Sequence, residues 1–284
     1  CFVLYYIKGF YVNCSKQKTN PIIMKPVYLI LFVGSMIAAN STYTEMQENI
    51  PPEWQSLFDG KTLDGWEPKI RGRKLGENFK NTFRVRDGAI VVAYDEYESF
   101  NHRYGHLFYT KKSFKNYHLK LDYRFVGDQA PDGQGWATKN SGVMLHSEDP
   151  STMLIQQRFP VSVEGQFLGG LNAGSRPTAN MCSPGTEVDI NSKMAKNHCV
   201  YSNSKTYHDE RWVSVEFIVY SDSLIHHIVE KETVMTYTNI RIGGGYLLPR
   251  FKDKIGMPLK EGYIALQSES HPIEFKNIMI KELD

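Results

Sequence analysis

Hydrophobic and polar residues alternate strictly along several stretches of the chain. In residues 117–125 every odd position is Tyr, Leu or Phe, and every even position is charged or His. Residues 212–220 repeat the pattern, and this period of two is typical of a strand with one buried face. The stretches 225–229 and 233–237, joined by three residues, predict a hairpin. Further strands are predicted over 88–94, 160–168, 262–267 and 273–280.

These strands predict an all-β protein. No stretch shows a convincing amphipathic helix with caps, and neither a linker nor an internal repeat interrupts the pattern. About a dozen short strands separated by turn residues indicate a sandwich or barrel. Two loops rich in Gly, Pro, Asn and Ser, 127–142 and 169–185, are longer than hairpin connections. Loops of that length often carry function.

Composition narrows the function classes. Lys and Arg total 33 and Asp and Glu total 31, so the net charge is only +2 over 284 residues. We therefore expect no nucleic-acid partner, since such proteins usually carry a strong basic excess on one face. Hydrophobic residues at 41% and charged residues at 23% are ordinary for a globular protein.

The N-terminal region resembles a targeting segment. Met24 and Lys25 precede an apolar run over 27–39 that ends in small residues. A charged start, about a dozen apolar residues and a small-residue end are typical of a secretory signal peptide. We interpret 24–39 as that peptide, 1–23 as an upstream extension or misplaced start, and 40–53 as a short linker. The alternative is an N-terminal anchor. The signal peptide predicts export to the periplasm or the extracellular space.

Two cysteines, Cys182 and Cys199, follow the signal-like segment and lie 17 positions apart. In an exported chain they are a plausible disulfide. The alternative is a zinc site that also uses His198 and His208. Adjacent His and Cys ligands without a CxxC spacing make the zinc site the weaker interpretation.

One strand carries the most informative polar row. In residues 160–168 the positions of Ser162, Glu164 and Gln166 share one face, opposite Val161, Val163 and Phe167. Upstream, the apolar stretch 140–146 ends in His146. If the two strands are neighbours, a carboxylate, an amide and an imidazole meet on one face and can hold hydroxyls and move a proton. Alternatively, the row is a solvated outer face. Gly165 slightly favours the first interpretation, because a mid-strand Gly permits close approach of a ligand.

Other catalytic motifs are absent or incomplete. Glu187 and Asp189 match part of the ExDxxE pattern of sandwich-fold endoglucanases, but Ser192 stands where the third carboxylate is needed. A retaining hydrolase of that type is not expected. The sequence contains no GxSxG, phosphate-binding Gly-rich loop or HExxH.

Five motifs in order resemble the 3-keto-disaccharide hydrolase family, long described as a domain of unknown function. They lie at 57–66 (LFDGKTLDGW), 140–146 (NSGVMLH), 163–166 (VEGQ), 262–267 (GYIALQ) and 275–278 (FKNI). The resemblance implies a concanavalin-like jelly-roll β-sandwich of two antiparallel sheets over residues 54–284. The family is typically exported and is common in Bacteroidetes and Planctomycetes. Gly165 replaces an apolar residue and His146 stands where many members have Arg, which suggests a different substrate choice.

The resemblance also implies a reaction. A 3-keto group makes the C2 proton of a sugar acidic, so a base can remove it and the C1 substituent can leave before water adds. Glu164 and His146 are the candidates for base and acid, in either order. Gln166, Asn140, Ser141, Gln267 and Trp136 are the candidates for binding the carbohydrate. A divalent metal could stabilise the enolate, although no ligand set is evident, and a separate sugar oxidoreductase would supply the keto group. The alternative function is a carbohydrate-binding module on the same fold, without catalysis.

Overall fold

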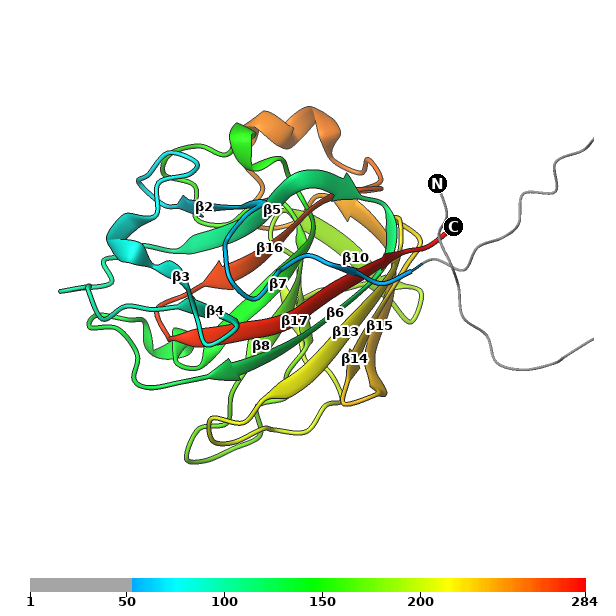
Figure 1. Ribbon diagram of the computed structural model, residues 1–284. Coiled ribbons are helices and arrows are strands. Elements are labelled where there is room, and N and C mark those ends of the chain that lie inside the picture. Colours follow the sequence, from blue (N-terminus) through cyan, green and yellow to red (C-terminus); the bar gives the residue numbers. More distant parts are fainter. Residues whose placement is uncertain (1–52) are drawn as a thin grey trace, which may run out of the picture. The chain divides into compact units, whose positions relative to one another are not determined.

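The computed structural model describes residues 53–284, which form two antiparallel β-sheets packed face to face (Figure 1). This confirms the predicted jelly-roll β-sandwich. The predicted upstream extension, the signal peptide and nearly all of the linker lie outside the described residues. None of the helices in the described part of the chain is long and apolar enough to cross a membrane.

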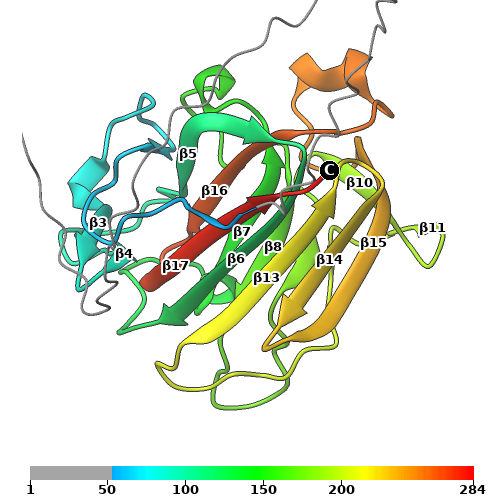
Figure 2. The same ribbon diagram turned by 45° about the vertical axis from the view of Figure 1, so that its right-hand side comes forward.

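The larger sheet has ten strands, and Figure 2 shows its central strands side by side. Strand β1 (Gln55–Ser56) pairs with β17 at the margin of this sheet. The order of the other nine is β11 (Lys193–Met194), β10 (Thr186–Ile190), β15 (Glu232–Ile242), β14 (Leu224–Val229), β13 (Val213–Tyr220), β6 (Asn116–Phe125), β17 (Ile273–Glu282), β4 (Ala89–Val92) and β3 (Phe83–Arg86).

The second sheet has seven strands and carries the residues of interest. Its order is β12 (Cys199–Val200), β9 (Asn180–Cys182), β8 (Val163–Leu168), β7 (Asn140–Ser147), β16 (Gly262–Ser268), β5 (Gly105–Phe114) and β2 (Trp66–Ile70). Four short 3₁₀ helices lie in the connections: η1 (Phe79–Asn81), η2 (Gly135–Ala137), η3 (Pro150–Thr152) and η4 (Pro249–Lys254). Strand β9 and helix η2 fall within the two segments that were predicted to be loops.

The hydrophobic core lies between the two sheets. The rings of Tyr123 on β6 and Phe167 on β8 stack across it, with centroids 4.2 Å apart and planes only 5° apart. Because side chains alternate along a strand, the odd positions of β8 face this core and the even positions face away from the larger sheet. Glu164 and Gln166 therefore lie on the outer face of the seven-stranded sheet.

Candidate active site

The strand register places polar residues in a row across the outer face of the seven-stranded sheet. Gln166 pairs with Asn180 on one side and with Gly142 on the other. Further along the same row, His106 pairs with Gln267 on β16 and with Lys69 on β2. A row of polar side chains on a sheet face is expensive to bury unless it serves a ligand or a network.

A pocket of about 350 Å³ opens over one end of this row. Its polar lining includes Glu164, Glu269, Asn140, Gln166 and Arg158, and its aromatic lining includes Tyr104, Trp136, Phe159 and Tyr246. The pocket volume lies at the small end of the range for ligand pockets. Polar groups facing aromatic walls suit a ligand with hydroxyl groups and an apolar ring face.

Two carboxyl groups are buried in this pocket. The residues Glu164 and Glu269 are only 5% and 4% exposed, and neither has a hydrogen-bonded cation within residues 53–284. Burial raises the pKa of Glu164 to about 8, and the neighbouring Gln267 amide partly opposes this shift. Burial and the charge of Glu164 together raise the pKa of Glu269 well above its usual value. Perturbed, mutually repelling carboxyls in a cleft are typical of acid–base sites.

The absence of a side chain at Gly142 makes room for the Glu164 carboxyl. A Cβ atom at Gly142 would lie 2.7 Å from Oε1 of Glu164 and 3.0 Å from the carbonyl oxygen of Gly165. Only a residue without a side chain therefore allows the Glu164 carboxyl to lie over β7, toward Gln267. The glycine of the Asn140–Gly142 motif has a steric explanation in this contact.

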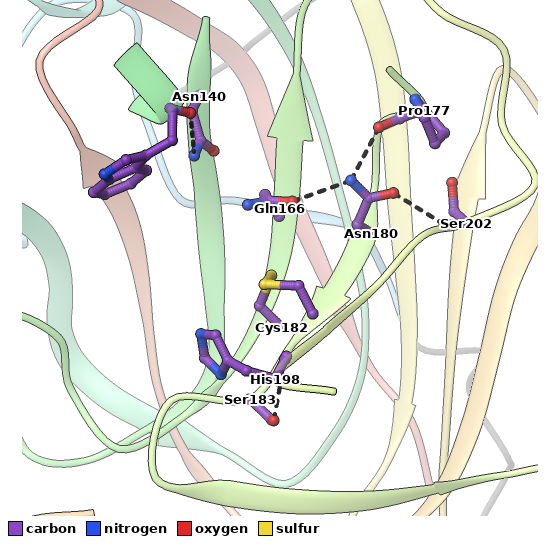
Figure 3. The surroundings of a disulfide bond; sticks show 10 residues. Asn140, Gln166, Pro177, Asn180, Cys182, Ser183, His198 and Ser202 are labelled. Atoms are coloured by element: carbon purple, nitrogen blue, oxygen red, sulfur yellow. Dashed lines mark hydrogen bonds between the residues drawn. A yellow bond between two sulfur atoms is a disulfide. The ribbon is translucent and has the colours of Figure 1, made fainter. Parts of the chain in front are cut away.

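Three of the predicted carbohydrate-binding residues line the pocket: Asn140, Gln166 and Trp136. The Asn140 amide donates to the Trp136 carbonyl at 3.4 Å, while its Oδ1 is buried with no partner in the described chain. Trp136 is 54% exposed, and its ring lies nearly parallel to that of Tyr104, with planes 13° apart. Gln166 accepts from the Asn180 amide at 3.1 Å (Figure 3).

Cys182 and Cys199 form a disulfide in the pocket wall, as predicted (Figure 3). Because Cys182 pairs with Glu164 across β8 and β9, the disulfide fixes β12 and the adjoining His198 beside the carboxyl pair. The alternative zinc site is wrong, because both sulfurs are consumed by this bond. Residues 53–284 contain no cluster of three or more His, Cys, Asp or Glu side chains that could hold a metal ion.

His146 does not meet Glu164, and the expected catalytic pairing of these two residues is wrong. His146 adopts a positive φ of 48°, and the β7–β16 register shifts beside it. This irregularity turns the ring into the region between the sheets, where it contacts Tyr117 with centroids 5.6 Å apart. Its two nitrogens each lie 3.1 Å from a backbone carbonyl, and burial lowers its pKa to about 4.

Two further expectations about the site are also wrong. Ser141 has the opposite orientation to Asn140, and its hydroxyl donates to the Gln267 carbonyl at 2.8 Å inside the protein. Gly165 does not admit a ligand, because a Cβ there would lie 2.4 Å from the ring of Phe217 in the core. Gln267, by contrast, lies on the outer face beside Glu164, but it is completely buried and forms no part of the pocket surface.

Three further residues that line the pocket were not predicted from the sequence: Glu269, Tyr104 and Arg158. Glu269 could have been found, because it follows Gln267 by two positions and continues the same face of β16 beyond the strand end. Glu187 and Asp189, in contrast, bind Arg241 at 3.2 and 3.0 Å on the other sheet. They therefore take no part in this site.

Comparison with known proteins identifies one family. The sequence profile of the 3-keto-alpha-glucoside-1,2-lyase-like domain matches residues 53–281. No protein with a curated description matches the sequence.

Similar solved structures include two from Parabacteroides distasonis, each described as a proposed glycosyl hydrolase. One is 20% identical over 81% of this chain and 94% of its own, with a TM-score of 0.47. The other is 17% identical over 81% and 100%, with a TM-score of 0.49. A Bacillus licheniformis beta-glucanase is 9% identical over 84% and 100%, with a TM-score of 0.44. Similarity at this level carries no argument about the activity.

Proposed function

This chain belongs to the 3-keto-alpha-glucoside-1,2-lyase-like family of carbohydrate-active proteins, and we propose that its pocket cleaves 3-keto-glycosides by elimination followed by hydration. The observation that carries the proposal is the pair of buried, uncompensated carboxyls, Glu164 and Glu269. A binding module would gain nothing from such a pair, since burying two acids near each other destabilises the fold.

The reaction requires a base and an acid. The base removes the proton at C2, and the electron pair forms the C1–C2 double bond as the C1–O bond breaks. The acid protonates the departing oxygen, so that the products are an unsaturated keto sugar and an alcohol. Addition of water across the double bond then gives the free 3-keto sugar, and the net result is hydrolysis. No oxidant or reductant is consumed in these steps.

We assign Glu164 as the base and Glu269 as the acid. The Gln267 amide favours the ionised form of Glu164, whereas the charge of Glu164 favours the protonated form of Glu269. Two carboxyls whose environments separate their proton affinities take opposite roles in acid–base catalysis. A base with a pKa of about 8 is also close to neutral pH, where general-base catalysis is most effective.

The pocket walls suit a small carbohydrate. The exposed Trp136 face, supported by Tyr104, offers a stacking platform for the apolar face of a sugar ring. The unpartnered Oδ1 of Asn140 and the half-buried Gln166 are placed to bind hydroxyl groups. No step of the proposed reaction depends on a metal ion.

We also propose that the protein works outside the cytoplasm, together with an enzyme that oxidises the sugar. Disulfides persist mainly in oxidising compartments, and this one lies in the pocket wall. An oxidoreductase acting on carbohydrates must supply the 3-keto group, because the elimination begins from the ketone.

The proposal is tested with a 3-keto-glucoside that carries a chromogenic leaving group, assayed in D₂O. We expect release of the chromophore and incorporation of deuterium at C2. Both should fall by roughly 10²-fold or more in Glu164→Gln and Glu269→Gln. Glu274→Gln is the matched control, because Glu274 is equally buried but binds Arg86 and Arg124 on the other sheet. Saturable binding without release would instead identify a carbohydrate-binding module.

A further inference from the structure

Five buried polar atoms next to the pocket have no hydrogen-bond partner among the described residues. They are Oε1 of Glu164, both amide atoms of Gln267 and both ring nitrogens of His106. Gln267 and His106 are also fully inaccessible to solvent. Unpaired buried polar groups are rare in folded proteins, and each one requires an explanation. Here they are contiguous, so a single explanation should cover all of them.

Four of the five atoms belong to one row of paired positions on neighbouring strands, and Glu164 reaches into it from the adjacent row. Gln267 and His106 are directly paired on β16 and β5, with side chains on the same face. Lys69 on β2 pairs with His106 on its other side. Glu164 reaches toward Gln267 over Gly142, whose missing side chain leaves the path open. The sequence of neighbours is therefore Lys69, His106, Gln267 and Glu164.

Ligand contact does not explain His106. The rings of Phe108 and Phe159 lie against it, each with its centroid 6.1 Å from that of His106. His106 is fully buried and does not line the pocket. Any effect of His106 on a substrate must therefore act through another residue.

The charged residues at the two ends, Lys69 and Glu164, set the direction of hydrogen-bond donation along the row. The Lys69 ammonium donates to the carbonyls of Arg73 and Leu154 at 3.1 and 3.2 Å, which fixes its position. Burial and this positive charge lower the pKa of His106 to about 3, so its ring is neutral and has one donor and one acceptor nitrogen. The Lys69 charge favours the tautomer of His106 whose unprotonated nitrogen is on the side of Lys69. The ring N–H group is then available to the side-chain carbonyl oxygen of Gln267.

We propose that His106 is a positioning residue, which orients the Gln267 amide so that its N–H group donates to Oε1 of Glu164. The chain of donors runs from Lys69 through His106 and Gln267 to Glu164. It closes in the free protein by rotation of the Gln267 amide and the His106 ring, whose polar atoms have no other partner among the described residues. This inference rests on the proposed function. It leaves Oε2 of Glu164 to face the substrate and favours the ionised, basic form of the carboxyl.

The test replaces His106 by a ring without nitrogen. His106→Phe keeps the packing against Phe108 and Phe159 but removes the donor to Gln267, so the ionised form of Glu164 becomes less favourable. We expect the acid limb of the pH profile of kcat/KM to move upward by about one unit, which lowers activity about tenfold on that limb. His106→Gln restores a donor and an acceptor and should recover most of the shift.

The same substitution at another buried histidine is the control. His227 lies in the larger sheet, away from the pocket, and bonds to the Ala179 carbonyl and the Tyr237 hydroxyl, each at 2.9 Å. His227→Phe should lower the melting temperature, because it leaves two polar partners unpaired, but should not move the acid limb. His106→Phe should move the acid limb without a comparable fall in the melting temperature. An unmoved acid limb in a folded His106→Phe protein would overturn the proposal.

A second readout does not depend on turnover. The protonation of Glu164 can be followed by carbon NMR of carboxyl-labelled glutamate, with Glu164→Gln identifying the signal. The other titratable groups of the pocket are unchanged in all variants: Glu269, Arg158, His198, Tyr104 and Tyr246. A higher titration midpoint in His106→Phe is expected even if no 3-keto-glycoside is cleaved. An unchanged midpoint refutes the positioning role, whereas a shifted midpoint without any turnover refutes only the proposed function.

Discussion

Glu164→Gln should stabilise the protein while it lowers turnover. In the unfolded chain this carboxyl ionises near its ordinary value of 4.5, whereas in the folded protein burial raises its pKa to about 8. A raised carboxyl pKa means that the folded state holds the proton more tightly. The wild-type protein therefore loses stability as the pH rises from 4.5 through 8, because the unfolded state alone releases the proton easily. A glutamine at this position does not titrate and avoids that loss.

The magnitude follows from the two pKa values. Each pH unit between the ordinary value of 4.5 and pH 7 corresponds to about 1.4 kcal/mol, so the destabilisation caused by wild-type Glu164 at pH 7 is at most about 3.5 kcal/mol. For a domain of this size, 1 kcal/mol shifts the melting temperature by about 2–4 °C. The variant should gain up to about 7–14 °C relative to the wild type between pH 4.5 and pH 7, added to any constant offset caused by the amide. Turnover should fall by roughly 10²-fold or more at every pH.

Calorimetric melting curves of both proteins at a series of pH values provide the assay. The slope against pH is the informative quantity, since packing differences between Glu and Gln do not titrate. Glu274→Gln should instead lower the melting temperature at neutral pH, because loss of the Glu274 charge leaves Arg86 and Arg124 without their shared partner. A difference in melting temperature between wild type and Glu164→Gln that stays constant from pH 4.5 to pH 8 would refute the reasoning about burial.

Three other substitutions test the pocket. Trp136→Ala should raise KM about tenfold with little change in kcat, because stacking contributes equally to the bound substrate and the transition state; a loss confined to kcat would contradict this. Replacing Cys182 and Cys199 together by Ser should cost about 3 kcal/mol in urea unfolding, the scale for a loop of this length, and an unchanged midpoint would contradict it. Gly142→Ala should lower kcat at least tenfold in a folded protein, since its Cβ would lie 2.7 Å from Oε1 of Glu164, and normal turnover would show that the carboxyl can move aside.

Alternation along the chain was sufficient to predict an all-β sandwich or barrel and the pocket face of one strand, whereas the jelly roll followed from the family resemblance. The period of two placed Glu164 and Gln166 on one face of β8, and the pocket lies on that face. The same rule shows that Asn140 and Ser141 cannot both face a ligand, because consecutive strand residues point to opposite sides. The alternation of positions in the sequence could therefore have excluded Ser141 from the pocket, although its place in the family motif favoured it as a binding residue.

Irregular backbone explains the error at His146. Parity counted from Asn140 assigns His146 to the pocket face, but its positive φ and the local register shift reverse that phase. A bulge of this kind leaves little trace in a single sequence. Glu269 was missed for a related reason, because the predicted strand ended at Gln267 and the face was not followed further. The stacking of Trp136 on Tyr104 joins distant segments, and no local pattern predicts it.

The two departures from the family pattern, Gly165 and His146, therefore have a different meaning from the one expected. Both face the space between the sheets, where Gly165 makes room for the Phe217 ring and His146 packs against Tyr117. A small residue opposite a large one keeps the core filled without overpacking. Neither position lines the pocket, so neither can select a substrate by contact. Differences in substrate choice should instead arise at the pocket walls, where Trp136 and Arg158 can meet the ligand directly.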